Sequence, residues 1–178
     1  MTTQRHDFDA APFLLEELPP VPRFSLRVRA ESRAQLAAVL KLDLPERVGH
    51  RAGTRGHEVL CLGPDEWTIL VPDDDREALI NSGTSAYAQI PHSLVEISDR
   101  EVTLRLSGPQ ALTALTAGCP RDVDALPTGR ATRTLFDSAT VVLWRDGQDN
   151  FRMDVWRSFL PHVRAILAKI SVELRSGL

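Results

Sequence analysis

The stretch GPDEWTILV at residues 63–71 is matched in pattern by GQDNFRMDV at residues 147–155. Each has Gly, then Asp two positions on, an aromatic, a polar and an apolar residue, and Val at the end. Upstream, FSLRV at 24–28 corresponds to VTLRL at 102–106. The copies lie about 80 residues apart, which is longer than the period of solenoid repeats. We interpret the pattern as duplication of a strand–helix–hairpin–helix unit; chance similarity of two hairpins is the alternative.

Two such units predict an α+β fold, in which antiparallel sheets have helices packed on one face. The predicted division is an extended, proline-containing arm at 1–22, a first repeat at 23–91 and a second repeat at 92–178. The two repeats are expected to form one compact domain. Apolar residues at 13–15 and 18 would allow the arm to dock on another part of the protein.

The hydrophobic pattern predicts the elements of the first repeat. Alternation at 24–28 has the period of a half-buried strand, and residues 31–32 open a helix that runs to Leu40. Strands at 59–62 and 67–71 flank a turn typical of a hairpin. The acidic run at 73–75 begins a second helix, since carboxylates favour the positive end of the helix dipole.

The second repeat is predicted to begin with a pair of strands at 93–98 and 101–107. A helix follows and ends near 118–120, and three strands come next, at 132–136, 140–144 and 151–155. The last helix begins near Ser158 and ends near Leu174, with Pro161 in its first turn, where proline is tolerated.

Composition and charge exclude several classes of function. The chain has 178 residues and a formal net charge of -3, which does not favour binding to nucleic acid. The N-terminal residues do not resemble a secretory signal, and the apolar runs are too short to span a membrane, so a cytoplasmic protein is expected. Cys61 and Cys119 lie outside any CxxC motif and are expected to be buried thiols, although they could pair.

Three candidate sites of chemistry are weak. The glycine-containing stretch at 49–57 could cradle an anion, but it lacks the P-loop and dinucleotide signatures and is better interpreted as a mobile surface connection. His50, His57 and Cys61 have no fourth metal ligand in range. The turn at 107–109 lacks the nucleophile motif and a base. The sequence therefore predicts no catalytic, cofactor-binding or metal-ligating residues in this chain.

An interface is the more informative possibility. Arginine suits contacts with carboxylates and phosphates, and tryptophan and arginine are typical anchors of protein interfaces. The interface candidates are Arg130, Arg133, Trp156, Arg157 and Phe159. The alternative, equally open, is that the aromatic residues belong to the core and the arginines are solvated.

The second half of the chain carries a family pattern. LRLSGP at 104–109, AGCP at 117–120, GRATRTLF at 129–136 and FRMDVWRSF at 151–159 stand in order, and the first half agrees more loosely through LGPDEW at 62–67. Together they resemble the γ subunit of heterotetrameric sarcosine oxidase. The match covers roughly residues 92–170.

The resemblance implies membership of a four-subunit flavoenzyme with α, β and δ subunits as partners. That enzyme demethylates sarcosine oxidatively to glycine, with production of hydrogen peroxide and 5,10-methylenetetrahydrofolate. It implies no cofactor in this chain, because FAD, FMN, NAD and zinc belong to the partner subunits. It also implies a fold similar to the folate-binding domain of the glycine-cleavage aminomethyltransferase and of TrmE.

Two functions follow as hypotheses. The first is a non-catalytic subunit that supports assembly of the complex. The alternative is a stand-alone folate-binding or one-carbon-transfer domain, which rests on analogy of fold. Such a site needs a pocket with an aromatic side chain and a buried carboxylate, for which the sequence offers Glu96, Asp99 and Glu101.

Overall fold

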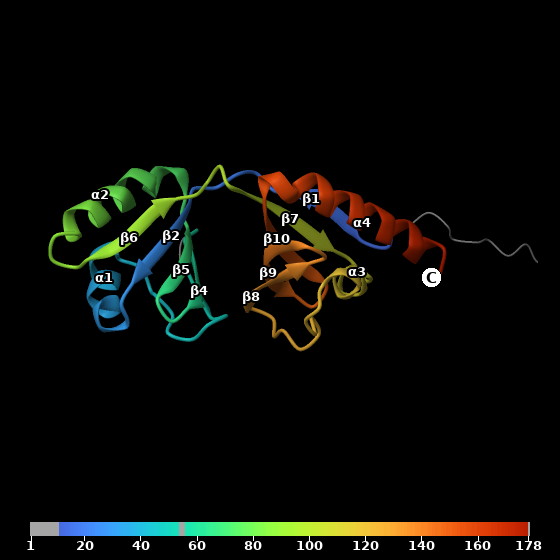
Figure 1. The fold of residues 1–178 in the computed structure, drawn as a ribbon, viewed down its shortest axis with the longest axis horizontal. Helices are drawn as coiled ribbons and strands as arrows, with labels where there is room; N and C mark the ends of the chain where they lie inside the picture. Colours follow the sequence, from blue (N-terminus) through green and yellow to red (C-terminus); the bar gives the residue numbers. More distant parts are fainter. Residues whose placement is uncertain (1–10, 54–55, 178) are drawn as a thin grey trace, which may run out of the picture.

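The computed structural model describes residues 11–53 and 56–177, and within them two antiparallel five-stranded sheets face each other (Figure 1). The first sheet has the order β3-β4-β5-β2-β6, and the second has the order β1-β7-β10-β9-β8. The strands of the first sheet are β2 (Arg23–Val28), β3 (Arg51–Ala52), β4 (Glu58–Gly63), β5 (Glu66–Leu70) and β6 (His92–Glu96). Those of the second sheet are β1 (Leu14–Glu17), β7 (Glu101–Ser107), β8 (Ala131–Phe136), β9 (Ala139–Gly147) and β10 (Asn150–Trp156).

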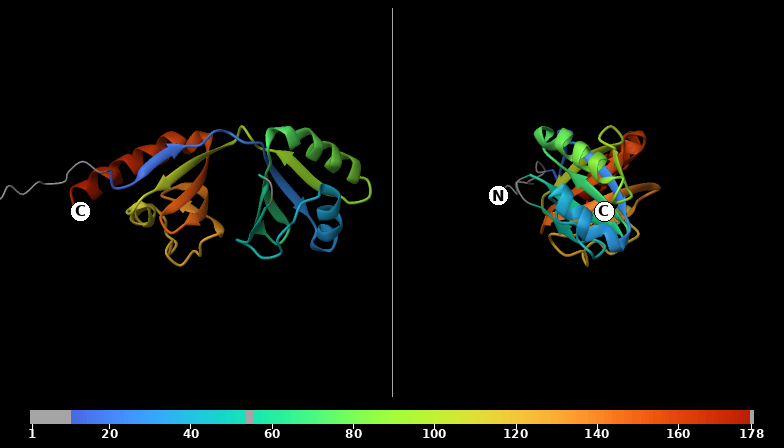
Figure 2. Two further views of the ribbon diagram at one scale, coloured as in Figure 1. Left: turned by 180° about the vertical axis from the view of Figure 1, so that it is seen from behind. Right: turned by 90° about the vertical axis from the view of Figure 1, so that its left-hand side faces the viewer.

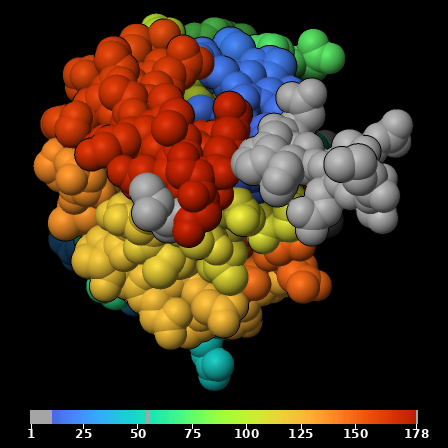
Figure 3. All heavy atoms as spheres, turned by 90° about the vertical axis from the view of Figure 1, so that its right-hand side faces the viewer, coloured from blue at the N-terminus to red at the C-terminus, as the bar shows by residue number. Residues whose placement is uncertain are grey.

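Helices cover the outer side of each sheet (Figure 2). The helices α1 (Arg33–Leu40) and α2 (Arg76–Ala86) pack on the first sheet, and α3 (Ala111–Gly118) and α4 (Leu160–Arg175) pack on the second. Short 3-10 turns, η1 (Ala30–Ser32), η2 (Asp73–Asp75) and η3 (Arg157–Phe159), lead into α1, α2 and α4. Seen from the end that carries the C-terminus, α4 and the α3 segment form the outer surface of the second half (Figure 3). The predicted α+β class is confirmed.

Alternation of side chains along the strands explains this layering. In β7, Leu104 and Leu106 are buried on the helix side, while Glu101 and Thr103 point toward the other sheet and bond to Arg23. The strand β2 behaves in the same way, since its buried apolar residues belong to the core under α1 and α2. Because successive side chains of a strand lie on opposite faces, each sheet presents an apolar face to its helices and, to the other sheet, a face with polar groups around a small apolar centre.

The structure corrects the predicted pairing at the start of the second repeat. Both strands exist, but β6 pairs with β2 in the first sheet, whereas β7 pairs with β1 and β10 in the second. The strand β6, which follows the predicted boundary between 91 and 92, therefore lies in the first sheet. The short connection between β6 and β7 resembles a hairpin turn in sequence. In the structure it is a turn in which Arg100 N donates to the carbonyl of Ile97 (3.0 Å), and through it the chain crosses from one sheet to the other.

Two further segments form strands that the sequence pattern did not predict. Within the arm, β1 pairs with β7 in the register Leu14↔Ser107, and Phe13 is part of the second core. Residues 1–10 of the arm lie outside the described residues. In the stretch expected as a surface connection, β3 pairs with β4 in the register Arg51↔Leu60. Both additions are edge strands, which lack the long alternating pattern that identifies a central strand.

Gly118, the last residue of α3, gives a test of the packing in the second core. A Cβ atom at this position would lie 2.5 Å from Cε2 of the Phe136 ring. Gly118→Ala is therefore expected to lower the free energy of unfolding by about 1–3 kcal/mol, measured by urea denaturation. The control is Gly147→Ala, where the nearest atom would be Asn150 Cβ at 3.5 Å. Equal stability of the two variants would contradict this description of the contact.

Candidate functional site

The side chains best suited to binding or catalysis lie in the space between the two sheets. Its centre is apolar and consists of Leu60, Leu70, Ala131, Val142 and Trp144. A cavity lies on each side of this centre, one of about 640 Å³ and one of about 430 Å³. We refer to them as the large cleft and the small cleft.

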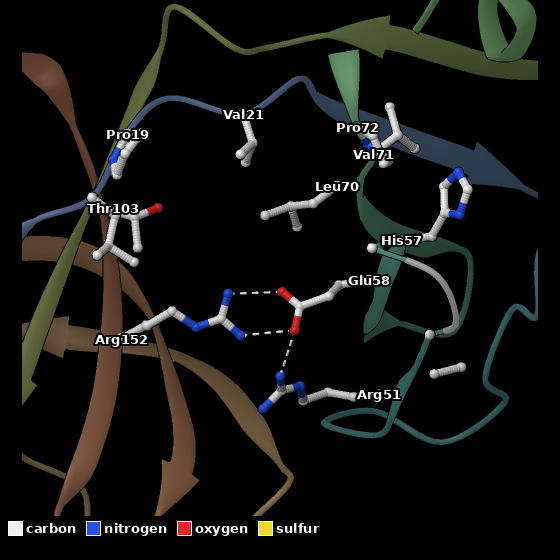
Figure 4. A pocket seen from close by; sticks show the side chains of 14 residues that line it. Pro19, Val21, Arg51, His57, Glu58, Leu70, Val71, Pro72, Thr103 and Arg152 are labelled. Carbon is white, nitrogen blue, oxygen red and sulfur yellow. Dashed lines mark hydrogen bonds and ion pairs between the residues drawn. The ribbon is translucent and has the colours of Figure 1, made fainter. Parts of the chain in front are cut away.

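In the large cleft, Glu58 is bonded to both Arg152 and Arg51 (Figure 4), and Asp146 completes a network of two arginines and two carboxylates. Arg152 Nη1 of β10 donates to Glu58 Oε2 of β4 (2.7 Å), and Arg51 Nη2 of β3 donates to Glu58 Oε1 (2.8 Å). Asp146 of β9 accepts from both arginines, at 2.6 Å from Arg152 Nε and 2.7 Å from Arg51 Nη1. Both guanidinium groups also lie over the Trp144 ring, with Cζ at 4.8 and 4.9 Å from the ring centroid. The network joins the two sheets and is neutral in sum.

The arginines control the protonation of these carboxylates. Burial raises the pKa of Glu58, but hydrogen bonds from Arg152 and the charges of both arginines lower it by more than burial raises it. The net pKa therefore lies below its ordinary value of 4.5. The same balance of burial against the two arginines lowers the pKa of Asp146 below 3.8. Both carboxylates are therefore charged at neutral pH.

This network predicts a pH-dependent part of the stability. Because the pKa of each carboxyl is lower in the folded than in the unfolded chain, the network stabilises the fold above the unfolded pKa and is lost as the pH falls through the folded pKa. The free energy of unfolding of the wild type and of the double variant Glu58→Gln/Asp146→Asn is measured with urea from about pH 7 to about pH 3. The difference between the two proteins should shrink below about pH 4. Exposed Glu31→Gln serves as control. A difference that stays constant over this range would refute the assignment.

The large cleft does not match the requirements of a pterin site. Among the described residues, no Phe, Tyr or Trp lines it, and its carboxylate, Glu58, is bonded to two arginines. The carboxylates that the sequence offered for this role are similarly engaged. Glu96 forms a pair of bonds with Arg76 (2.9 and 2.7 Å), and Glu101 accepts from Arg23 and Arg100. Asp99 lies in the crossing between the sheets, where its backbone carbonyl accepts from Arg157 Nε (3.0 Å).

A second ionic cluster is buried between the clefts. The guanidinium of Arg23 on β2 donates to Glu101 Oε2 (2.6 Å), Thr103 Oγ1 (2.8 Å) and Asp154 Oδ1 (2.9 Å), all on the second sheet. Asp154 also accepts from the Trp144 indole N–H (2.6 Å) and from Thr103 Oγ1 (2.6 Å). Every residue of this cluster is held by partners from the opposite sheet or the neighbouring strand, which points to a structural role.

The small cleft collects part of the predicted interface residues. Arg133 of β8 and Trp156 of β10 line it, together with Arg27, Glu66 and Arg100. Among the aromatic candidates, Trp156 and Phe159 are both exposed, so neither belongs to a core. Arg157 and Phe159 form the exposed turn η3 directly after Trp156.

Arg130 lies apart from that group. It precedes β8. Desolvation is the largest cause of the lowered pKa of His50, and the positive charge of Arg130 is the next.

The residues that sequence reasoning missed are Arg27 and Arg100 in the small cleft and Arg51, Glu58 and Arg152 in the large one. Alternation did place Arg27 opposite the buried side chains of its strand, but that face ordinarily meets solvent, so the pattern gave no reason to expect a second sheet.

The weaker candidate sites have the following structural settings. Within residues 11–53 and 56–177, no three His, Cys, Asp or Glu side chains are grouped so that they could hold a metal ion. His57 pairs with Asp75 (3.1 Å). Cys61 and Cys119 are free and buried, and burial raises the pKa of the Cys119 thiol to about 11. None of the described helices has the length and apolar character required to cross a membrane.

Comparison with known proteins agrees with this fold. Residues 29–173 match the model of the sarcosine oxidase, gamma subunit family. The chain is 36% identical over 132 residues to the sarcosine oxidase subunit gamma of Corynebacterium sp. (strain U-96), a match covering 72% of this chain and 63% of that relative. It is 36% identical over 121 residues to the Arthrobacter sp. subunit, covering 66% and 59%. The matched segment thus spans less than two thirds of each relative.

Solved structures give the same result. The chain superposes with a TM-score of 0.83 and 30% identity on a chain of the heterotetrameric sarcosine oxidase from Corynebacterium sp. U-96, covering 93% of this chain and 87% of that one. Aminomethyltransferase T from Bartonella henselae shares the fold, with a TM-score of 0.67 at 14% identity over 90% of this chain and 46% of that one. From the match to the family model and from these relatives, the chain belongs to the sarcosine oxidase γ subunit family.

Proposed function

We propose that this chain is a non-catalytic γ subunit of a heterotetrameric sarcosine oxidase and that it supports assembly of the complex with the α, β and δ subunits. The observation that carries the proposal is the superposition of 93% of the chain on a chain of the heterotetrameric enzyme. The reaction would be oxidative demethylation of sarcosine to glycine, with hydrogen peroxide and 5,10-methylenetetrahydrofolate as further products. FAD, FMN, NAD and zinc would be held by the partner subunits.

The chemistry of the clefts supports a structural role over a folate-binding one. A carboxylate that binds a pterin ring must be available to the ligand, whereas Glu58, Glu96 and Glu101 each accept bonds from arginines of this chain. Breaking the Arg23–Glu101 pair, whose side chains are 4% and 8% exposed, would leave a buried charge without its partner, which opposes ligand binding there. The arginine–carboxylate pairs of the large cleft instead join the sheets and give the chain a rigid shape for docking.

Co-expression with the α, β and δ subunits of the same organism tests the proposal. The expected result is one complex that contains all four chains in size-exclusion chromatography. Elution of this chain alone, while the other three assemble, would contradict it. Calorimetric titration of the purified chain with tetrahydrofolate tests the alternative, and heat of binding at micromolar ligand would favour a stand-alone folate-binding domain.

We further infer that the fold arose by duplication. Written in the order β6-β2-β5-β4-β3, the first sheet parallels β1-β7-β10-β9-β8 of the second, so that each strand has a counterpart. In this correspondence β6 follows α2 at the end of the first unit, while its counterpart β1 comes from the arm that precedes both units. The parallel order supports the duplicated strand–helix–hairpin–helix unit, with one edge strand supplied from the other end of the chain.

For the contact surface, we propose Arg133, Trp156, Arg157 and Phe159. They are exposed and lie on β8, at the end of β10 and in the following turn η3. We leave Arg130 out of this surface because its surroundings are those of His50 rather than of the small cleft.

A further inference from the structure

In the small cleft, the negative and positive side chains lie at different depths from the surface. Its carboxylates lie deep, with the side chains of Glu66 and Glu101 only 14% and 8% exposed. Its arginines lie at the rim, with the side chains of Arg27, Arg100 and Arg133 54%, 46% and 43% exposed. A ligand that approaches from solvent therefore meets guanidinium groups before it meets any carboxylate of the cleft.

The deep carboxylates orient these arginines without occupying all of their donors. Glu66 accepts from Arg27 Nη2 (2.9 Å) and from both terminal nitrogens of Arg133. Glu101 accepts from Arg100 Nη2 (2.8 Å) on one oxygen and from Arg23 on the other. Each guanidinium carries five N–H donors in a planar fork, so fixed arginines of this kind remain able to bind a further carboxylate.

Exposed apolar side chains border the same cleft. Trp156 is half-exposed at its wall, and Arg100 Cζ lies 5.4 Å from the Trp156 ring centroid. Leu135 pairs across the strands with Thr140, and Val95 pairs with Ser25; Thr140 and Ser25 both line the cleft. Since directly opposed residues share a face of a sheet, Leu135 and Val95 continue the apolar border on the facing sides of both sheets. Both are exposed.

We propose that the small cleft receives an acidic segment of a partner subunit, whose carboxylates bind Arg100 and Arg133 and whose apolar side chains cover Trp156, Leu135 and Val95. This rests on the proposed function and specifies the surface and the chemistry of the contact. Fixed guanidinium groups at the rim are complementary to carboxylates, and exposed tryptophan beside arginine is the composition of an interface centre. A small free anion would leave the apolar border uncovered.

Affinity measurements with matched variants test the assignment. Arg100→Gln/Arg133→Gln and Trp156→Ser are each expected to weaken binding to the co-expressed α, β and δ subunits at least about tenfold. Arg164→Gln is the control, because Arg164 is similarly exposed and pairs with Glu17 at the outer helix layer. Its affinity should equal that of the wild type. Thermal unfolding of each variant checks that the fold is kept.

Hydroxyl-radical footprinting of the wild-type chain is a second measurement that does not depend on the folding of a variant. Trp156 and Leu135 should react in the free chain and be protected in the complex. Equal reactivity in both states, or unchanged affinity of the folded Arg100→Gln/Arg133→Gln variant, would overturn the cleft assignment while the proposed function stands. Failure of the wild-type chain to join the complex would overturn both. A dimer of this chain that the double variant abolishes would also overturn the assignment, because a second copy would then occupy the cleft.

Discussion

Asp154→Ala is expected to lower the free energy of unfolding by about 3–5 kcal/mol, the cost of breaking a buried ion pair by removing one partner. The carboxylate of Asp154 is almost fully buried between the sheets and accepts bonds from Arg23, Thr103 and Trp144. Its loss leaves the Trp144 indole N–H without an acceptor and the Arg23 guanidinium with Glu101 as its remaining carboxylate in the cluster. Urea denaturation followed by circular dichroism measures the change.

A second variant at Asp154 tests the contribution of its charge, and a variant at Asp124 serves as the control. Asp154→Asn keeps an oxygen that can accept a bond but loses the charge, so its cost should be smaller than that of Asp154→Ala. Asp124→Ala is the matched control, because Asp124 also faces an arginine, Arg145 at 3.8 Å, but its side chain is largely exposed. Its effect should stay within about 0.5 kcal/mol. A cost for Asp154→Ala as small as that of the control would show that the buried cluster does not hold the sheets together.

Trp144→Ala has the second large expected effect, again about 3–5 kcal/mol, because it opens a cavity in the centre of the inter-sheet layer. Trp144 is fully buried there, in one cluster with Leu60, Leu70 and Val142. The variant also removes the ring over which Arg51 and Arg152 lie. The same denaturation experiment applies.

Trp144→Phe distinguishes the volume of the ring from its hydrogen bond. Phenylalanine fills most of the space but cannot donate to Asp154, so a cost of about 1–2 kcal/mol is expected. Combining Trp144→Phe with Asp154→Ala should give a non-additive result, because each change removes the one bond of 2.6 Å that the two residues share. Additive effects of the two changes would argue against that bond.

These predictions concern a layer that differs from the two cores under the helices. Each helix-covered core is apolar, whereas the layer between the sheets combines a small apolar centre with ion pairs on either side. Buried ion pairs contribute little net stability compared with apolar packing, but they are costly to break and require one arrangement of the groups. We infer that the ionic layer helps to specify how the two sheets are placed relative to each other.

Periodicity in the sequence was sufficient to predict most of the elements. Alternation at 24–28 identified β2, and the corresponding pattern at 102–106 identified β7. These signals are local, because a strand or helix with one buried face repeats its pattern within a few residues. The α+β class could be anticipated in this way, whereas the sequence left open whether Trp156 and Phe159 are exposed or belong to the core.

The tertiary structure alone decided which strands pair and which charges meet. The neighbours β6 and β7 lie in different sheets, and Arg23 bonds to Asp154 across 131 positions of the chain. The outward face of an alternating strand looks the same in sequence whether it meets water or a second sheet. Only the stacking of the sheets brought Arg27, Arg100, Arg133 and Trp156 to one cleft and left Arg130 outside it.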